Sequence, residues 1–156
     1  MNKRTIVISI TALVIDLLTK YFATMFLLNK SITIIPNFFN LTYAMNTGAA
    51  WSLLDNHPII LTCISIVLLI VLFIFKNNFK SNLRNDIAFG ILYGGIGGNL
   101  MNRLFNGYVI DFLDFKIFNY DYPIFNIADI LVVFGVILLI FAIIKGEDHE
   151  NSSKRK

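Results

Sequence analysis

The last long apolar run of the chain, residues 130–144, is opened by the stretch Phe125-Asn126-Ile127-Ala128-Asp129, which follows Pro123. Asp129 therefore stands at the mouth of an apolar segment. An ionisable side chain in a lipid setting is costly and usually marks a functional site. We interpret Asp129 as one half of a catalytic pair and look for a second carboxylate elsewhere in the chain.

The composition of the 156-residue chain favours a membrane protein. Hydrophobic residues make up 56% and charged residues 15%, whereas soluble domains are about half apolar and a quarter charged. The net charge is only +3 and the positive residues form no stripe, so nucleic-acid binding is not expected. The single cysteine, Cys63, excludes an internal disulfide framework and a metal site built from cysteines. Its place in an apolar run indicates packing.

Four stretches approach the length of about 20 apolar residues that a membrane-spanning helix requires. They are residues 5–28, 59–75, 87–104 and 127–144. We predict an all-α polytopic membrane protein whose four transmembrane helices form a single domain over residues 1–146. Residues 147–156 are polar and charged, and we predict a disordered cytoplasmic tail there.

The distribution of positive charge predicts the orientation of these helices. Lys and Arg precede the first stretch, lie between the second and third, and close the chain, whereas the other two loops hold chiefly Lys30 and Lys116. The positive-inside rule therefore places both termini in the cytoplasm. The first stretch follows a positive start as a secretory signal would, but Asp16 and Lys20 follow without a small-residue cleavage site, so we predict a retained helix.

The two loops on the outer side carry strand patterns. Residues 31–46 alternate loosely, are rich in Ile, Phe, Thr and Tyr, and are interrupted by Pro36. Residues 107–125 are similar after the turn signal Asn106-Gly107. We expect a small β-rich extracytoplasmic platform.

Two features inside the predicted helices indicate helix packing. Asp16 and Lys20 are four residues apart, so they share a helix face and can form an ion pair that ties the first helix to its neighbours. Lys20 can also reach outward toward substrate or headgroup oxygen. Gly90, Gly94 and Gly98 recur every four residues, a spacing that lets helices approach closely.

A second carboxylate follows a polar helix face. Asn99, Asn102 and Arg103 share one face near an outer helix end, where they line a cavity or bind another helix. Asp111 comes eight residues after Arg103 between apolar neighbours, so it can meet Asp129 at the outer face. Two carboxylates in a cleft of low dielectric share a proton. One then activates water while its protonated partner polarises a peptide carbonyl.

Other chemistries fit the sequence less well. A metal is the competing use of Asp111, Asp114 and Asp121, but their spacing matches no standard ligand loop, and His57 and His149 lie elsewhere. No serine stands in a nucleophile elbow. We expect neither a metal nor a cofactor.

Four blocks of sequence, in order along nearly the whole chain, resemble the lipoprotein signal peptidases (signal peptidase II), which are bacterial membrane aspartyl proteases. The blocks are Asp16-Leu17-Leu18-Thr19-Lys20, Asn46-Thr47-Gly48-Ala49-Ala50-Trp51, Gly94-Gly95-Ile96-Gly97-Gly98-Asn99-Leu100-Met101-Asn102-Arg103 continuing to Val109-Ile110-Asp111-Phe112, and Pro123-Ile124-Phe125-Asn126-Ile127-Ala128-Asp129.

This resemblance implies that Asp111 and Asp129 are the catalytic pair. It also implies a set of residues that bind substrate or support the pair, namely Asp16, Lys20, Asn46, Gly48, Asn99, Arg103, Asn126 and Ala128. The implied reaction is cleavage of the signal peptide of diacylglyceryl-modified prolipoproteins just before the lipidated cysteine. The implied setting is a monomer among the lipids of the bacterial cytoplasmic (plasma) membrane, with its active site at the outer face.

Three positions depart from the family pattern. The family usually has Gln where this chain has Leu17, Arg where it has Met45, and Asp where it has Asn102. A divergent lipopeptide-binding paralogue with weak or no protease activity is therefore an alternative. A small transporter or structural membrane protein, in which the polar faces only pack helices, is another.

Overall fold

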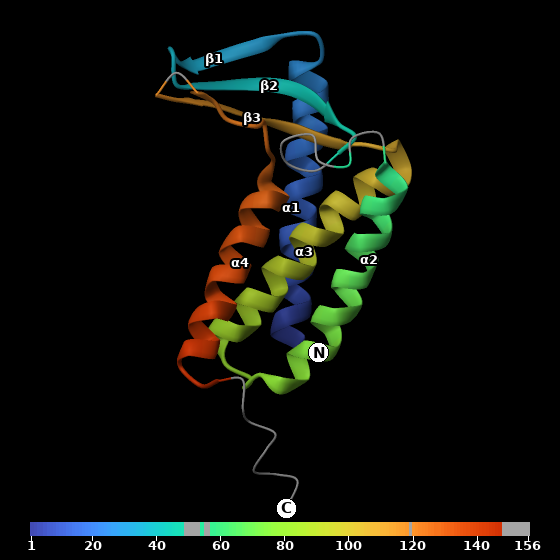
Figure 1. Ribbon diagram of the computed structural model, residues 1–156, viewed down its shortest axis with the longest axis vertical. Coiled ribbons are helices and arrows are strands. Elements are labelled where there is room, and N and C mark those ends of the chain that lie inside the picture. Colours follow the sequence, from blue (N-terminus) through green and yellow to red (C-terminus); the bar gives the residue numbers. More distant parts are fainter. Residues whose placement is uncertain (49–53, 55–56, 119, 148–156) are drawn as a thin grey trace, which may run out of the picture.

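The computed structural model describes residues 1–48, 54, 57–118 and 120–147. Within these residues, long helices stand side by side and a small sheet covers one end of the bundle (Figure 1). In chain order the elements are α1 (Lys3–Leu27), β1 (Ser31–Ile35), β2 (Phe39–Asn46), α2 (Pro58–Phe75), the 3-10 turn η2 (Lys76–Asn78), α3 (Leu83–Asn106), β3 (Val109–Ile117), β4 (Tyr120–Asp121) and α4 (Ile127–Ile144).

Three helices in the described part of the chain are long and apolar enough to cross a membrane. They are α1, α2 continued by η2, and α4, with mean hydropathies of 1.8, 3.1 and 3.1. They correspond to three of the four predicted spans. The fourth predicted span, α3, is polar at both ends and rich in glycine. It lies in the middle and contacts the other three helices.

The glycines of α3 allow this central position. A methyl group added at Gly90 would lie 2.6 Å from Cγ2 of Ile8, and one added at Gly94 would meet Cβ of Ala12. On another side of α3, a methyl group at Gly95 would lie 2.7 Å from the carbonyl oxygen of Ala128. The backbone of α3 therefore touches both α1 and α4, as the four-residue spacing predicts for helices that pack closely.

The sheet is antiparallel in the order β1-β2-β3-β4. In the first loop, β1 and β2 flank Pro36, and the second loop holds β3 and β4. The strands predicted in both loops are therefore confirmed. Gly107 ends α3 with a φ of +78°, a left-handed conformation that glycine adopts without steric cost. This turn leads directly into β3, where Ala44 of β2 is paired with Asp111.

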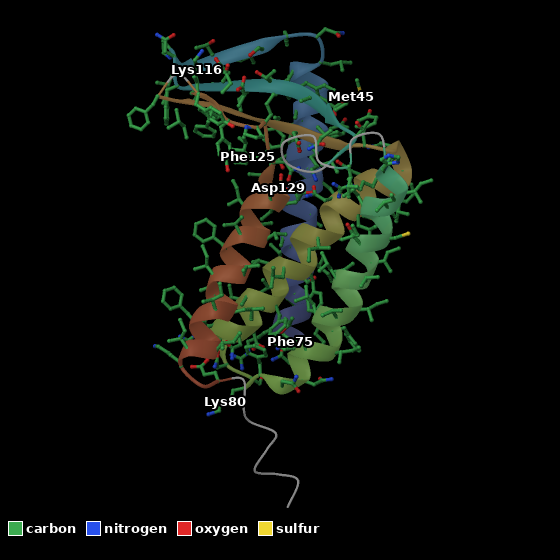
Figure 2. The ribbon with its side chains drawn as sticks, in the orientation of Figure 1. Met45, Phe75, Lys80, Lys116, Phe125 and Asp129 are labelled. Atoms are coloured by element: carbon green, nitrogen blue, oxygen red, sulfur yellow. The ribbon has the colours of Figure 1, made fainter. Side chains whose placement is uncertain are left out.

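The opposite end of the bundle is held by polar contacts that the sequence pattern did not indicate. Asp86, fully buried, accepts hydrogen bonds from Nδ2 of Asn2 at 2.7 Å and from Nζ of Lys76 at 3.3 Å. The N–H of Lys80 donates to the carbonyl oxygen of Glu147 at 2.9 Å. The start of α1, the turn between α2 and α3 and the end of α4 therefore meet far from the sheet (Figures 1 and 2).

Candidate active site

Asp111 lies on β3 and is only 2% exposed. Its Oδ2 accepts a hydrogen bond from Nδ2 of Asn46 at 2.8 Å, and its Oδ1 accepts one from Nδ2 of Asn126 at 2.6 Å. Burial raises the pKa of Asp111 to about 6, because removing the carboxyl group from water disfavours its charged form. The nearby charge of Asp129 acts in the same direction, whereas the bond from Asn46 opposes it.

Asp129 occupies the first turn of α4, where it forms a capping box with Asn126. The side-chain oxygen of Asn126 accepts from the N–H of Asp129 at 3.1 Å, and Oδ2 of Asp129 accepts from the N–H of Asn126 at 3.0 Å. Oδ1 of Asp129 also accepts from Nδ2 of Asn99 at 2.8 Å. Two donors, the backbone N–H of Asn126 and Nδ2 of Asn99, therefore hold the carboxyl group of Asp129 at the start of α4.

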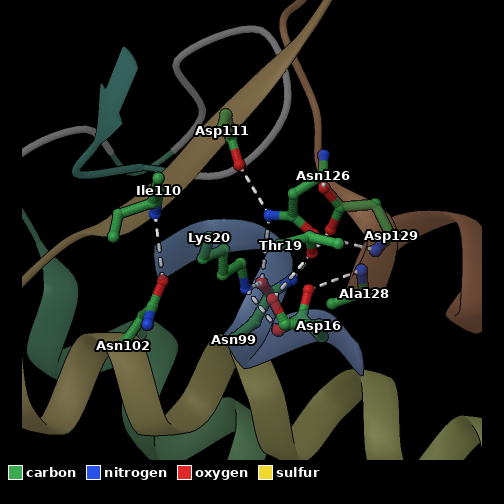
Figure 3. A network of polar contacts seen from close by, with 10 residues as sticks. All are labelled: Asp16, Thr19, Lys20, Asn99, Asn102, Ile110, Asp111, Asn126, Ala128 and Asp129. Carbon is green, nitrogen blue, oxygen red and sulfur yellow. Dashed lines mark hydrogen bonds and ion pairs between the residues drawn. The ribbon is translucent and has the colours of Figure 1, made fainter. Parts of the chain in front are cut away.

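Asn126 connects the two aspartates. Its Nδ2 donates to Oδ1 of Asp111 and also to Oδ1 of Asn99 at 3.1 Å, while its backbone N–H binds Asp129 (Figure 3). A single fully buried residue therefore contacts both carboxylates from the start of α4. The structure thus brings Asp111 and Asp129 to one site, and it gives Asn126 the role of holding them there.

Asp16 and Lys20 form a buried ion pair beneath the aspartates. Nζ of Lys20 lies 2.7 Å from Oδ2 of Asp16 and donates to Oδ1 of Asn99 at 2.7 Å. The other oxygen of Asp16 accepts from the N–H of Ala128 at 2.9 Å, so the pair links α1 to α3 and α4. The predicted tie between helices is confirmed. The side chain of Lys20 is only 1% exposed and binds Asp16 and Asn99 inside the bundle, so its reach toward substrate or headgroup oxygen stays a prediction.

Arg103 joins α3 to the end of β2. Its Nη2 donates to the carbonyl oxygen of Gly48 at 3.3 Å, and the N–H of Gly48 donates to Oδ1 of Asn46 at 2.9 Å. The guanidinium interacts electrostatically with both Asp111 and Asp129. Among the described residues, its buried Nε has no hydrogen-bond partner. The rest of this block, residues 49–51, lies outside the described part of the chain.

Asn102 supports the strand that carries Asp111, a role that sequence reasoning missed. Its Oδ1 accepts from the N–H of Ile110 at 3.1 Å, and its side chain is 7% exposed (Figure 3). The signal in the sequence is that Asn102 follows Asn99 by three residues, which places both side chains on one face of the helix. Met45, the residue paired with Ile110 on β2, is 62% exposed. Within the described part of the chain, the side chains of Asn102 and Met45 form no hydrogen bond with either aspartate.

The family model described as signal peptidase (SPase) II matches residues 8–145. The chain belongs to the signal peptidase II family. Lipoprotein signal peptidases of Staphylococcus aureus strains JH9 and Newman are each 38% identical over 153 residues, which cover 97% of this chain and 94% of each relative. Members of this family are aspartic proteases, and the apolar helices fit a membrane protein.

Two solved structures, each described as a bacterial membrane enzyme determined by the in meso method, have the same fold as this signal peptidase II chain. The first, at 2.3 Å resolution, has a TM-score of 0.79 and 38% identity and covers 97% of this chain and 91% of its own. The second, at 1.9 Å resolution, has a TM-score of 0.77 and 40% identity and covers 90% and 92%.

The remaining acidic residues near the signal peptidase II site have their own contacts. Oδ2 of Asp114 accepts from Oγ1 of Thr42 at 2.9 Å, and Asp121 pairs with Lys116 at 3.4 Å. Within the described ranges, no three His, Cys, Asp or Glu side chains are grouped so as to hold a metal ion.

Asn102 supplies a testable prediction. Asn102→Ala leaves the buried N–H of Ile110 without its acceptor, which is expected to destabilise the protein by about 1–3 kcal/mol and to reduce cleavage. Asn102→Asp keeps an acceptor oxygen and is expected to retain cleavage. Thermal unfolding and peptide cleavage of the two purified variants check this, and equal losses in both would contradict it.

Proposed function

We propose that this protein is a membrane aspartyl endopeptidase that cleaves the signal peptide of diacylglyceryl-modified prolipoproteins just before the lipidated cysteine. In this proposal Asp111 and Asp129 are the catalytic pair. The observation that carries it is the bridge through Asn126, which joins two carboxylates at the sheet-covered end of an apolar bundle. A lipid-bearing apolar helix is the substrate suited to a site at the end of membrane-embedded helices.

The two carboxyl groups have different environments, which supports different roles. Asp129 accepts hydrogen bonds from Asn99 and from a backbone N–H at a helix start, and in this proposal it acts as the base that removes a proton from water. Asp111 is buried and its pKa is raised to about 6, so it acts as the protonated partner that donates to the scissile carbonyl oxygen. Collapse of the tetrahedral intermediate returns that proton to Asp111, and the proton taken from water goes to the leaving amine.

The supporting residues divide into two groups. Asn46 ends β2, Gly48 follows it, and Arg103 reaches them from α3. We assign all three to the substrate backbone, for which Nε of Arg103 is a donor without a partner among the described residues. Asp16, Lys20, Asn99 and Ala128 hold the helices beneath the aspartates and act through them.

In the proposed topology, residues 1–146 form one domain that crosses the membrane four times, including α3. The contacts of α3 with all three other helices support this, because shielding by neighbours reduces the need for an apolar surface. Both termini and residues 147–156 lie in the cytoplasm, and the sheet lies outside. The basic residues near the end opposite the sheet, such as Arg4, Lys76 and Lys80, support this orientation. The protein works as a monomer.

The function is tested with the purified protein and one precursor peptide made with and without the diacylglyceryl group on its cysteine. We expect cleavage of the lipidated peptide alone, with the modified cysteine as the new N-terminus. Tight binding without any product would instead favour the lipopeptide-binding paralogue, the alternative raised by Met45 and Asn102.

The environment of Asp111 also predicts a pH dependence. The active free enzyme needs this group protonated, and its pKa is about 6. The value of kcat/KM is therefore expected to fall as the pH rises above about 6, by about tenfold per unit, because this parameter follows the titration of the free enzyme. A pH profile of kcat/KM for the lipidated peptide checks this. A rise from pH 6 to pH 8 would contradict the assignment of Asp111 as the acid.

A further inference from the structure

A hollow lies beside the polar network beneath the sheet. It has a volume of about 300 Å³ and is bounded by α1, α3, β2 and the start of β3. Its lining residues are Leu17, Lys20, Tyr21, Thr24, Tyr43, Asn102, Asn106, Tyr108 and Ile110. The volume is at the lower limit of that found for small-molecule sites.

This cavity is separate from the catalytic pair. Ile110 lines it, and Asp111 is the next residue of β3, so their side chains point to opposite faces of the strand. In Figure 3, Asn102 and Ile110 lie to the left of Lys20, Asp111 stands above it, and Asn126 lies to the right. Neither Asp111 nor Asp129 lines the cavity, whereas Lys20 does.

Apart from Lys20, the polar groups of the cavity are neutral. The hydroxyl groups of Tyr43 and Tyr108 lie 3.5 Å apart, and the amide of Asn106 is nearby on the wall. Burial and the contact with Tyr108 raise the pKa of Tyr43, so this hydroxyl, like that of any tyrosine, is uncharged at neutral pH. The charge of Lys20 is matched by Asp16. The lining therefore offers donors and acceptors suited to hydroxyl groups.

The cavity borders the apolar surface of the bundle. Tyr21 lines it and is 59% exposed, and the neighbouring Phe22 and Phe105 are also exposed. Further along the bundle from the sheet, Gly97 of α3 and Leu13 of α1 are half-buried neighbours. A methyl group added at Gly97 would have Cδ1 of Leu13 at 3.7 Å and no other described contact within 4 Å.

We propose that this cavity binds the glycerol headgroup of a phospholipid from the leaflet on the side of the sheet. The headgroup hydroxyls contact Tyr43, Tyr108 and Asn106, and one acyl chain runs along α1 and α3 past Leu13 and Gly97. The bound lipid fills the space between the sheet and these helices, so it supports β3 from the face opposite Asp111. This site does not depend on the peptidase reaction.

The test measures lipids retained by the purified full-length protein from bilayer discs that contain three lipids with identical chains. Phosphatidylglycerol carries the glycerol headgroup, phosphatidic acid carries negative charge without headgroup hydroxyls, and phosphatidylcholine carries neither. Native mass spectrometry is expected to find phosphatidylglycerol retained about tenfold over both others, the preference given by one or two hydrogen bonds. Equal retention of phosphatidylglycerol and phosphatidic acid would overturn the proposal.

Matched variants locate the binding. Thr24→Leu fills the cavity and is expected to abolish the preference, whereas Thr11→Leu places the same side chain on the exposed surface of α1 and is expected to leave it unchanged. Tyr43→Phe removes one hydroxyl with almost no change in volume, so it keeps the test valid if Thr24→Leu does not fold. Undiminished preference in the folded Thr24→Leu or Tyr43→Phe protein would contradict a site in this cavity.

Discussion

Replacing Asp129 with asparagine is expected to lower the cleavage of a lipidated precursor by about 10³-fold or more. Removing a positioned acid or base typically costs 10²- to 10⁴-fold, and an amide cannot take the proton of the attacking water. The folded structure should survive, because the new amide oxygen still accepts one of the two hydrogen bonds that now reach Asp129 from Asn99 and from the N–H of Asn126. Single-turnover cleavage, with thermal unfolding measured in parallel, checks both statements.

Asp114→Asn is the matched control. Asp114 lies three residues after Asp111 on the same strand, but it accepts its hydrogen bond from Thr42, away from Asn126. The same chemical change there is expected to leave cleavage within about twofold of the unmodified protein, since surface changes away from the site have small effects. Comparable losses in the Asp114 and Asp129 variants would show that the assay reports general damage. Full activity of Asp129→Asn would refute the catalytic pair.

Asp16→Ala is expected to have the largest effect on stability, a loss of about 3–5 kcal/mol. The change leaves the ammonium of Lys20 buried without its counter-ion, and breaking a buried ion pair from one side costs this much. It also removes the acceptor for the N–H of Ala128. Thermal unfolding in a fixed detergent, followed by loss of the monodisperse species, measures the effect.

The paired variant Asp16→Asn with Lys20→Met separates charge from packing. Asparagine keeps an acceptor for Ala128, and methionine fills the space of the lysine stem without a charge, so no unpaired ion remains. Replacing both partners of a buried pair is often neutral, and the double variant should therefore be more stable than Asp16→Ala. If it were less stable, the ion pair itself, rather than the avoidance of a lone charge, would be the stabilising element.

Much of the fold is predictable from local patterns. The residues of α4 agree with the predicted 127–144 because the apolar run and its capping residues are contiguous. The strands around Pro36 and the turn at Gly107 also follow from signals within a few residues. The aspartates could be paired because each stands at the end of an apolar segment, and the resemblance then named the reaction.

The remaining contacts join residues that are far apart in the sequence, so no local pattern indicates them. Asn126 reaches Asp111 across 15 residues, and Asp86 binds Asn2 across 84. The hydrogen bond between Asn102 and Ile110 spans only eight residues, but it depends on the turn at Gly107 bringing β3 back beside α3. The polarity of α3 likewise depends on its contacts with the other three helices, which no local pattern indicates.

The ion pair of α1 has a consequence for the biogenesis of the protein. During synthesis, α1 enters the bilayer before its distant partners exist, since Asn99 is made 79 residues after Lys20 and Ala128 is made 112 residues after Asp16. A lone charge in a nascent helix would oppose partitioning by about 2.5–3.5 kcal/mol. Because Asp16 and Lys20 are four residues apart, they can form their ion pair as soon as α1 is helical, so α1 carries no lone charge. When α3 and α4 later enter the bilayer, the same two side chains bind Asn99 and the N–H of Ala128 and so position these helices against α1.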